Sequence, residues 1–224
     1  MPMNSITKIR QSRPAQWLSQ YMVGLVVVIF SIFIFAKLAE DVWFKEGFSW
    51  DAPIILGIHR LSNPTLDTIM KLVTQTGNAG AIAIVLIMAG SFIWKHRKIE
   101  AFSILGAFGG AVGINALLKL VFARPRPHLF QPLVVETDFS FPSGHVTAAV
   151  AVYGFIAFLL WQNRHRAWAV ISALWVFMVA FSRIYLGVHY PSDTLAAMAF
   201  TSLWLIVVLY ARNIFLQRMK QPSS

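Results

Sequence analysis

Residues 194–211 read TLAAMAFTSLWLIVVLYA and contain no charged side chain. A helix needs about 20 mostly apolar residues, within a range of about 17–25, to cross the hydrocarbon core of a bilayer. This stretch therefore predicts a membrane-spanning helix. Similar uncharged windows occur at 14–36, 72–94, 101–118, 139–163 and 167–182. The last of these is short, and it reaches the length of a span by continuing past Arg183 to Val188.

The composition agrees with six membrane spans. The chain has 224 residues, of which 57% are hydrophobic and only 12% are charged. A typical soluble domain carries about 25% charged residues. We therefore expect an all-α integral membrane bundle of six transmembrane helices, formed by residues 21–212, with cytoplasmic tails at residues 1–20 and 213–224.

The first two spans carry signals of their own. Window 14–36 is longer than the roughly 7–15 residue apolar region of a signal peptide, so we expect an uncleaved first span. Asn63-Pro64 puts proline at the first position of a helix, and one helix is expected from there to about Trp94.

The chain contains no cysteine, which excludes disulfides, thiolate nucleophiles and cysteine metal sites.

Basic residues are unevenly distributed among the helix ends. Eleven of the 19 lysines and arginines lie at one set of ends, with only Glu100 as an acid beside them. Positive residues mark the cytoplasmic side, so both termini are expected in the cytoplasm and the protein in the plasma membrane. The net charge of +10 therefore indicates a membrane partner rather than nucleic acid. The segments expected on the outer side are 39–71, 119–143 and 183–193.

Lys119 and Arg126 lie at the predicted outer end of the third span. A charge at such a depth costs roughly 2.5–3.5 kcal/mol on insertion scales and marks a candidate functional site. Arginine suits bidentate contact with phosphate, whereas lysine acts as a point charge. We expect these two cations to hold phosphate oxygens and Arg124 to contact lipid headgroups instead.

Pro142-Ser143-Gly144-His145 introduces the fourth helix. A serine N-cap followed by glycine exposes free backbone N–H groups, which form a natural anion-binding site at a helix start. We expect Ser143 and Gly144 to seat a phosphate and His145 to face it.

Arg183, His189 and Asp193 surround the start of the sixth helix. His189 and Asp193 are four residues apart and can meet across one turn. A carboxylate that accepts from one imidazole nitrogen leaves the other nitrogen free to attack. Taken singly, the three fragments also fit a lipid contact, a plain helix start and a structural His–Asp pair. Together, on one side of the membrane, they predict a single phosphate site.

The joint pattern K-x6-R-P, P-S-G-H and S-R-x5-H-x3-D resembles the type 2 phosphatidic acid phosphatase family of membrane lipid phosphatases. In this chain the motifs occupy Lys119–Pro127, Pro142–His145 and Ser182–Asp193, and every motif position is filled. The resemblance implies a hydrolase of phosphoric monoester or diphosphate bonds in lipids that uses no metal or other cofactor.

The resemblance also implies a role for each site residue. His189 would take the phosphoryl group as the nucleophile, and Asp193 would orient and polarise it. His145 would protonate the leaving oxygen and then activate water. The equatorial oxygens would be held by Lys119, Arg126, Arg183, Ser143 and Gly144.

Several substrates and two other classes of protein stay open. Phosphatidylglycerophosphate is the first choice of lipid substrate and undecaprenyl diphosphate the second, with phosphatidate and diacylglycerol pyrophosphate also open. A phosphate or lipid transporter is an alternative because intramembrane charges also mark transport routes. Against it, the charges gather at one surface and no inverted repeat is visible. A vanadate-dependent haloperoxidase has similar motifs, but those enzymes are soluble.

The third span also carries a glycine pattern. Gly106 with Gly110, and Gly109 with Gly113, form two overlapping small-xxx-small pairs. Such pairs allow helices to approach closely in lipid, so we expect close packing along this helix.

Overall fold

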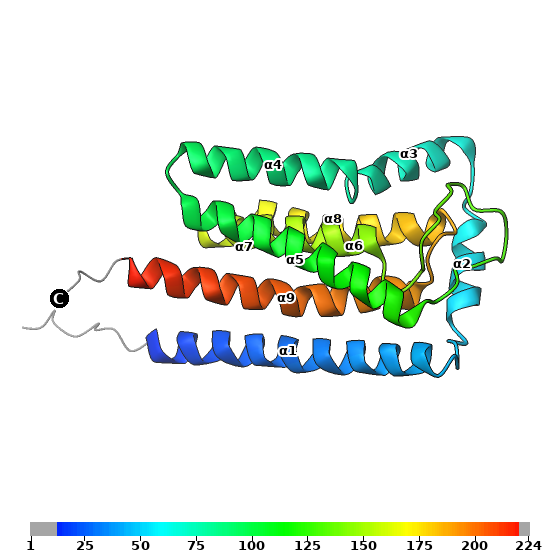
Figure 1. The fold of residues 1–224 in the computed structure, drawn as a ribbon, viewed down its shortest axis with the longest axis horizontal. Coiled ribbons are helices and arrows are strands. Elements are labelled where there is room, and N and C mark those ends of the chain that lie inside the picture. The colour runs from blue at the N-terminus through cyan, green and yellow to red at the C-terminus, as the bar shows by residue number, and fades with distance from the viewer. Residues whose placement is uncertain (1–12, 220–224) are drawn as a thin grey trace, which may run out of the picture.

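The computed structural model describes residues 13–219, with side chains from residue 24 onward (Figure 1). The parts of the expected tails at 1–12 and 220–224 lie outside the described residues. Within that range every regular element is helical, so the prediction of an all-α fold is confirmed. The elements are α1 (Arg13–Trp43), α2 (Asp51–His59), α3 (Pro64–Gln75), α4 (Ala79–Trp94), α5 (Lys98–Phe122), α6 (Gly144–Ala149), a π-helical turn η1 (Val150–Gly154), α7 (Phe155–Gln162), α8 (Arg166–Tyr185) and α9 (Pro191–Arg218).

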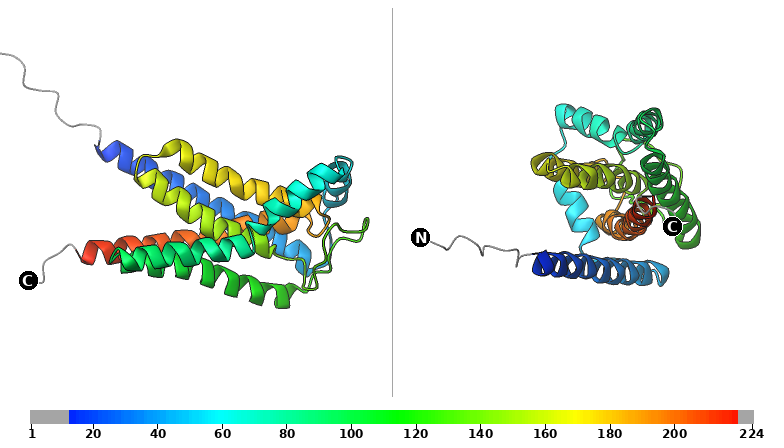
Figure 2. Two further views of the ribbon diagram at one scale, coloured as in Figure 1. Left: turned by 90° about the horizontal axis from the view of Figure 1, so that it is seen from above. Right: turned by 90° about the vertical axis from the view of Figure 1, so that its left-hand side faces the viewer.

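The long helices run side by side along one direction (Figures 1 and 2). Helix α9 packs against α1 and α5, and α5 packs in turn against α4. Alanines on α4 and α5, among them Ala89 and Ala107, are buried in the largest apolar core together with Phe155 of α7. Small residues at such contacts let helix backbones approach one another. The described ends of the chain lie together at one end of the bundle, while α2 and the 123–143 segment gather at the other.

Within the described part of the chain, five helical segments are long and apolar enough to cross a membrane. They correspond to the second to sixth expected spans. Helix α1 is not among them when only the described residues are considered. It is nonetheless long and lies alongside α9 (Figure 1). The five segments are Pro64–Trp94, Lys98–Phe122, Gly144–Gln162, Arg166–Tyr185 and Pro191–Arg218.

The helix expected from Asn63-Pro64 begins where the sequence indicates. Pro64 is its first residue, and the Asn63 side chain accepts a hydrogen bond of 3.0 Å from the Leu66 backbone N–H. This cap satisfies one of the free donors at a helix start. The start of the second predicted span is therefore confirmed.

The same helix does not run unbroken to Trp94. It is interrupted at residues 76–78, between α3 and α4. Tyr153 donates to the Thr76 carbonyl at 3.0 Å, and Trp175 donates to the Thr76 hydroxyl at 2.9 Å. Gly77 then lies so close to α6 that a Cβ would meet the His145 carbonyl oxygen at 2.8 Å. The break depends on these tertiary contacts, so hydropathy along the chain does not indicate it.

Of the four glycines on α5, Gly110 is the one that packs closely against a neighbouring helix. The Gly106 carbonyl accepts a 3.1 Å hydrogen bond from the Trp204 indole, and a Cβ at Gly110 would collide with the same ring. Nothing lies within 4 Å of a Cβ at Gly106, Gly109 or Gly113. Within the described chain, the expectation of close packing is therefore confirmed at Gly110, with no such contact at the second pair.

Candidate active site

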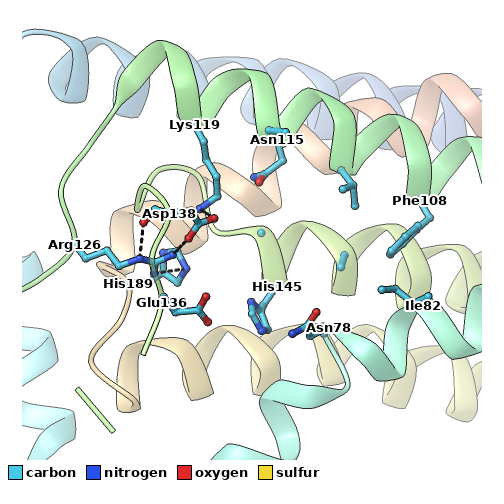
Figure 3. Close-up of a pocket in the computed structure, with 15 residues that line it drawn as sticks. Asn78, Ile82, Phe108, Asn115, Lys119, Arg126, Glu136, Asp138, His145 and His189 are labelled. Carbon is cyan, nitrogen blue, oxygen red and sulfur yellow. Dashed lines mark hydrogen bonds and ion pairs between the residues drawn. The ribbon is translucent and has the colours of Figure 1, made fainter. Parts of the chain in front are cut away.

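The three motif fragments meet at the end of the bundle where α5 ends and where α6 and α9 begin. They surround a cavity of about 370 Å³ (Figure 3). The predicted site residues that line this cavity are Lys119, Arg126, Gly144, His145 and His189. The remaining three, which are buried behind its walls, are Ser143, Arg183 and Asp193.

His189 and Asp193 form the pair that their spacing predicts. His189 lies just before α9, and Asp193 is in the first turn of that helix, with Nδ1 and Oδ2 3.4 Å apart. Both side chains are buried, with exposed fractions of 1% and 0%. The same carboxylate oxygen accepts from the Tyr190 backbone N–H at 2.9 Å and from the Ser140 hydroxyl. The carboxylate is therefore fixed in orientation relative to the imidazole.

The other imidazole nitrogen of His189 faces the cavity side of the pair. Its Nε2 lies 3.2 Å from Nη1 of Arg126. A guanidinium can only donate, so Nε2 is the acceptor and Nδ1 carries the proton that points to Asp193. Burial, followed by the positive charges of Arg183 and Arg126, lowers the pKa of His189 well below its usual value. The imidazole is therefore neutral, and its Nε2 holds a lone pair.

Lys119 and Arg126 converge on one carboxylate, that of Asp138. The Lys119 ammonium lies 2.8 Å from Asp138 Oδ2, and Arg126 pairs with Oδ1 of the same side chain. Arg126 also donates from Nε to the Asp138 carbonyl at 2.9 Å. Burial alone raises the pKa of Asp138, but the Lys119 and Arg126 cations outweigh it and lower this pKa to about 2. In this structure the Asp138 carboxylate therefore pairs with both of the cations that are predicted to bind phosphate.

Arg183 lies deeper than expected. Its side chain is 1% exposed, donates to the Thr74 hydroxyl at 2.7 Å and pairs with Glu136. Glu136 lines the cavity, whereas Arg183 does not. The positive charge of Arg183 therefore reaches the cavity from behind Glu136.

The start of α6 is held from α5. Asn115 donates to the Pro142 carbonyl at 3.2 Å and to the Thr147 hydroxyl at 3.1 Å. Ser143 is the N-cap residue, but its hydroxyl makes no capping bond and is buried without a hydrogen-bond partner among the described residues. His145 and Asn78 point into the cavity beside it (Figure 3).

The expectation that Arg124 contacts lipid headgroups is wrong. Its side chain is only 12% exposed and makes ion pairs with Asp193 and Asp51. Ala123 ends α5 in a left-handed conformation, with φ of 43°. The chain therefore changes direction after α5. Arg124 then lies against the start of α9 and α2 instead of continuing outward along the axis of α5.

Sequence reasoning missed the acidic partners of the site. Glu136 and Asp138 lie in the predicted outer loop between two motifs, and Asp51 lies far away on α2. The position of the two loop acids beside the motifs was the available signal. Among the described residues, no three histidine, aspartate or glutamate side chains are grouped closely enough to hold a metal ion.

Comparison with known proteins agrees with this arrangement. The model of the PAP2 superfamily matches residues 100–216. Phosphatidylglycerophosphatase B of Bacillus subtilis is 32% identical over 155 residues, covering 66% of this chain and 76% of that protein. Undecaprenyl-diphosphatase BcrC of the same organism is 33% identical over 153 residues, covering 65% and 75%.

A solved structure has the same fold. The crystal structure of a transmembrane PAP2-type phosphatidylglycerolphosphate phosphatase from Bacillus subtilis superposes with a TM-score of 0.75 at 29% identity. The match covers 88% of this chain and 98% of that one. The chain therefore belongs to the PAP2 superfamily and is, like these relatives, a membrane phosphatase.

Proposed function

We propose that the protein hydrolyses the phosphate ester or diphosphate of a membrane lipid through a phosphohistidine at His189. The observation that carries this proposal is the geometry of His189, whose Nδ1 faces Asp193 while Nε2 lies beside Arg126 at the cavity. A neutral imidazole held in this way is an activated nucleophile. Phosphatidylglycerophosphate is the first substrate proposed and undecaprenyl diphosphate the second, in keeping with the two relatives of this chain.

The first half of the reaction forms the phosphohistidine. Nε2 of His189 attacks phosphorus, and the bond between phosphorus and the lipid oxygen breaks. His145 donates a proton to that oxygen, which leaves as the lipid alcohol or, from a diphosphate, as the lipid monophosphate. Asp193 balances the positive charge that develops on the imidazole.

The second half regenerates the enzyme. His145, now without that proton, accepts one from a water molecule as the water oxygen attacks phosphorus. The bond between phosphorus and Nε2 breaks, its electron pair returns to His189, and phosphate leaves. Phosphoryl transfer depends mainly on positioning and charge stabilisation, which Lys119, Arg126 and the backbone at Ser143-Gly144 supply.

Substrate binding requires the Asp138 carboxylate to release Lys119 and Arg126. Lys119 and Arg126 already donate to this carboxylate, and a dianionic phosphate bound beside it would be repelled. The incoming phosphate therefore replaces Asp138 on the two cations, and the loop that carries Asp138 moves with it.

The rest of the cavity suits the first part of a lipid tail. Its lining changes from polar at Lys119 to apolar at Phe108, with Ile82 of α4 and Val112 of α5 beside it. Lys119 lies eleven residues after Phe108 on the same helix, which is about 16 Å at a rise of about 1.5 Å per residue. A free phosphate needs no cavity of that length, whereas a headgroup with its attached chain does. Lateral access between α4 and α5 agrees with this lining.

The proposed setting is the plasma membrane with six spans, both termini cytoplasmic and the site on the outer side. The span besides the five segments above is α1, which buries Leu38 and Val42 against the bundle but leaves a second apolar face exposed. An apolar face of that extent fits lipid rather than water. The exposed residues on it include Leu25, Val26, Ile29, Phe30 and Phe33.

The direct test is phosphate release by the purified protein in detergent with EDTA. We expect turnover to persist in EDTA and His189→Ala to lower it by more than about 10³-fold, because loss of a nucleophile removes the covalent route. His165→Ala, an exposed histidine at the start of α8, is the matched control and should keep full activity. Full activity in His189→Ala, or its loss in EDTA, would contradict the mechanism.

The same assay compares the two substrates. We expect phosphatidylglycerophosphate to be favoured in kcat/KM by at least about tenfold, equivalent to about 1.4 kcal/mol. The reverse preference would assign the enzyme to undecaprenyl diphosphate. Release from neither lipid would contradict the proposed substrate class.

A further inference from the structure

Arg124 sits between two buried carboxylates behind the catalytic pair. Its Nη1 lies 2.5 Å from Asp193 Oδ1, and its Nη2 lies 3.0 Å from Asp51 Oδ2. Asp51 begins α2 and is 2% exposed. The contacts join three segments that are far apart in the chain, α2, the end of α5 and the start of α9.

The two oxygens of Asp193 have separate partners. Oδ1 is held by Arg124, whereas Oδ2 faces Nδ1 of His189 at 3.4 Å. A carboxylate that is fixed through one oxygen cannot rotate freely to change the position of the other. The contact of Arg124 with Oδ1 therefore acts together with the Tyr190 N–H and the Ser140 hydroxyl on Oδ2 to set the direction in which Asp193 meets the imidazole.

Arg124 is itself held in place from several sides. Asp51 accepts from the Ser192 backbone N–H at 3.0 Å and from the Ser192 hydroxyl at 2.6 Å. Arg124 also donates to that hydroxyl at 2.8 Å, and its guanidinium carbon stacks 4.1 Å from the centre of the Tyr190 ring. Guanidinium groups fit such forked and stacked contacts better than ammonium groups do. Arg124 has one orientation in this arrangement, and that orientation is directed at Asp193.

We infer that Arg124 is a positioning residue for the phosphatase reaction and that it acts on His189 through Asp193, with Asp51 as its anchor. This inference rests on the proposed function of His189 and Asp193. Arg124 does not line the cavity that holds the phosphate, so it has no part in gripping the substrate. The two arginines of Arg124-Pro125-Arg126-Pro127 thus serve opposite sides of the nucleophile: Arg126 faces Nε2, and Arg124 supports the carboxylate beyond Nδ1.

The test separates kcat from phosphate binding. Arg124→Ala should lower kcat by about 100-fold, the scale of loss when a reacting group is misplaced by about 1 Å. The inhibition constant of inorganic phosphate should stay within threefold of wild type, because Lys119 and Arg126 are untouched. Arg124→Lys should recover part of kcat, since one ammonium can pair with only one of the two carboxylates. Arg60→Ala, an exposed arginine outside this cluster, is the control and should leave kcat unchanged.

A double-mutant comparison shows whether Arg124 acts through Asp193. In an Asp193→Asn background, Arg124→Ala should have less than a threefold further effect, because residues that act as a unit are not additive. Independent, multiplying losses would overturn the inference, as would a phosphate inhibition constant that weakens in step with kcat. If Arg124→Ala does not yield folded protein, Asp51→Asn and Arg124→Lys undergo the same measurements and decide the matter. Full activity in both His189→Ala and Asp193→Asn would instead refute the proposed function on which the inference depends.

Discussion

Asp138 holds a central position among the charges of the site. It pairs with Lys119 and Arg126, the two cations on the cavity wall that the motifs assign to phosphate. Its pKa of about 2 means that it stays charged at every physiological pH. If Lys119 and Arg126 bind phosphate as proposed, the carboxylate competes with it at all of these pH values, and a pH change among them does not relieve the competition.

The competition can be measured with Asp138→Asn. We expect this variant to lower the inhibition constant of inorganic phosphate by about 2- to 5-fold, since a partly exposed ion pair is worth about 1 kcal/mol or less. The assay is inhibition of lipid hydrolysis by added phosphate at fixed ionic strength.

A matched control removes one negative charge elsewhere. Glu46→Gln makes the same change in net charge at an exposed position of the 44–50 segment between α1 and α2. It should have little effect, because Glu46 is exposed and salt screens the interactions of exposed charges. Equal responses from Asp138→Asn and Glu46→Gln would show that Asp138 does not compete for the cations.

Among the helices, the break between α3 and α4 has the most direct connection to the site. Gly77 in the break faces the backbone of His145, and a Cβ there would lie 2.8 Å from the His145 carbonyl oxygen and 2.8 Å from Cγ1 of Val179. The backbone of α6 cannot yield to this contact without displacing the imidazole that lines the cavity. The interruption of the predicted helix therefore gives α6 the space in which His145 is placed.

Gly77→Ala tests this relation. We expect the variant to be destabilised by about 1–3 kcal/mol, the usual cost of overpacking, and to lose kcat as His145 shifts. Thermal unfolding in detergent and turnover at saturating lipid measure the two effects. Gly90→Ala in α4, where nothing lies within 4 Å of the added Cβ, should unfold within about 0.5 kcal/mol of wild type. If both variants melt and turn over alike, the close approach of Gly77 to α6 has no functional consequence.

For the molecule as a whole, the ends of the helices divide into two groups. The site, α2 and the 123–143 segment lie at one end of the bundle. The start of α1 and the end of α9 lie at the other (Figure 1). The second end also holds a buried ion pair, in which Arg212 lies 3.5 Å from Glu100 while Arg97 pairs with the same carboxylate at 3.0 Å. Glu100, the one acid among the basic residues at the expected cytoplasmic helix ends, is therefore paired with arginines of the bundle itself.

The orientation of the bundle can be tested by labelling, because the chain has no cysteine of its own. We expect Glu46→Cys to react with a membrane-impermeant maleimide in intact cells, and Asn163→Cys to react only after permeabilisation. Both positions are exposed, and they lie in segments at opposite ends of the bundle. The opposite pattern would reverse the orientation, and labelling of both in intact cells would contradict a transmembrane arrangement. The cysteine-free parent chain is the background control.

The sequence by itself determined the helical membrane fold and the identity of the motif residues. Uncharged windows predict spans because a bilayer demands about 20 apolar residues and internal satisfaction of every backbone hydrogen bond. Local spacing was enough for the His189–Asp193 pair and for helix starts at Pro64, Gly144 and Pro191, since these depend on residues within one turn of each other. Membrane orientation and the roles of the site residues stay predictions.

Only the tertiary structure decided which charges face the phosphate cavity. Arg124 and Arg126 are two residues apart and look alike in the sequence, yet one supports Asp193 and the other contacts His189. The pairing of Arg183 with Glu136 and the break at residues 76–78 likewise depend on partners many residues away. Hydropathy and motif spacing report what a residue's near neighbours require. They do not indicate which distant side chain will pack opposite a residue. Contacts with such distant side chains determine the arrangement of this site.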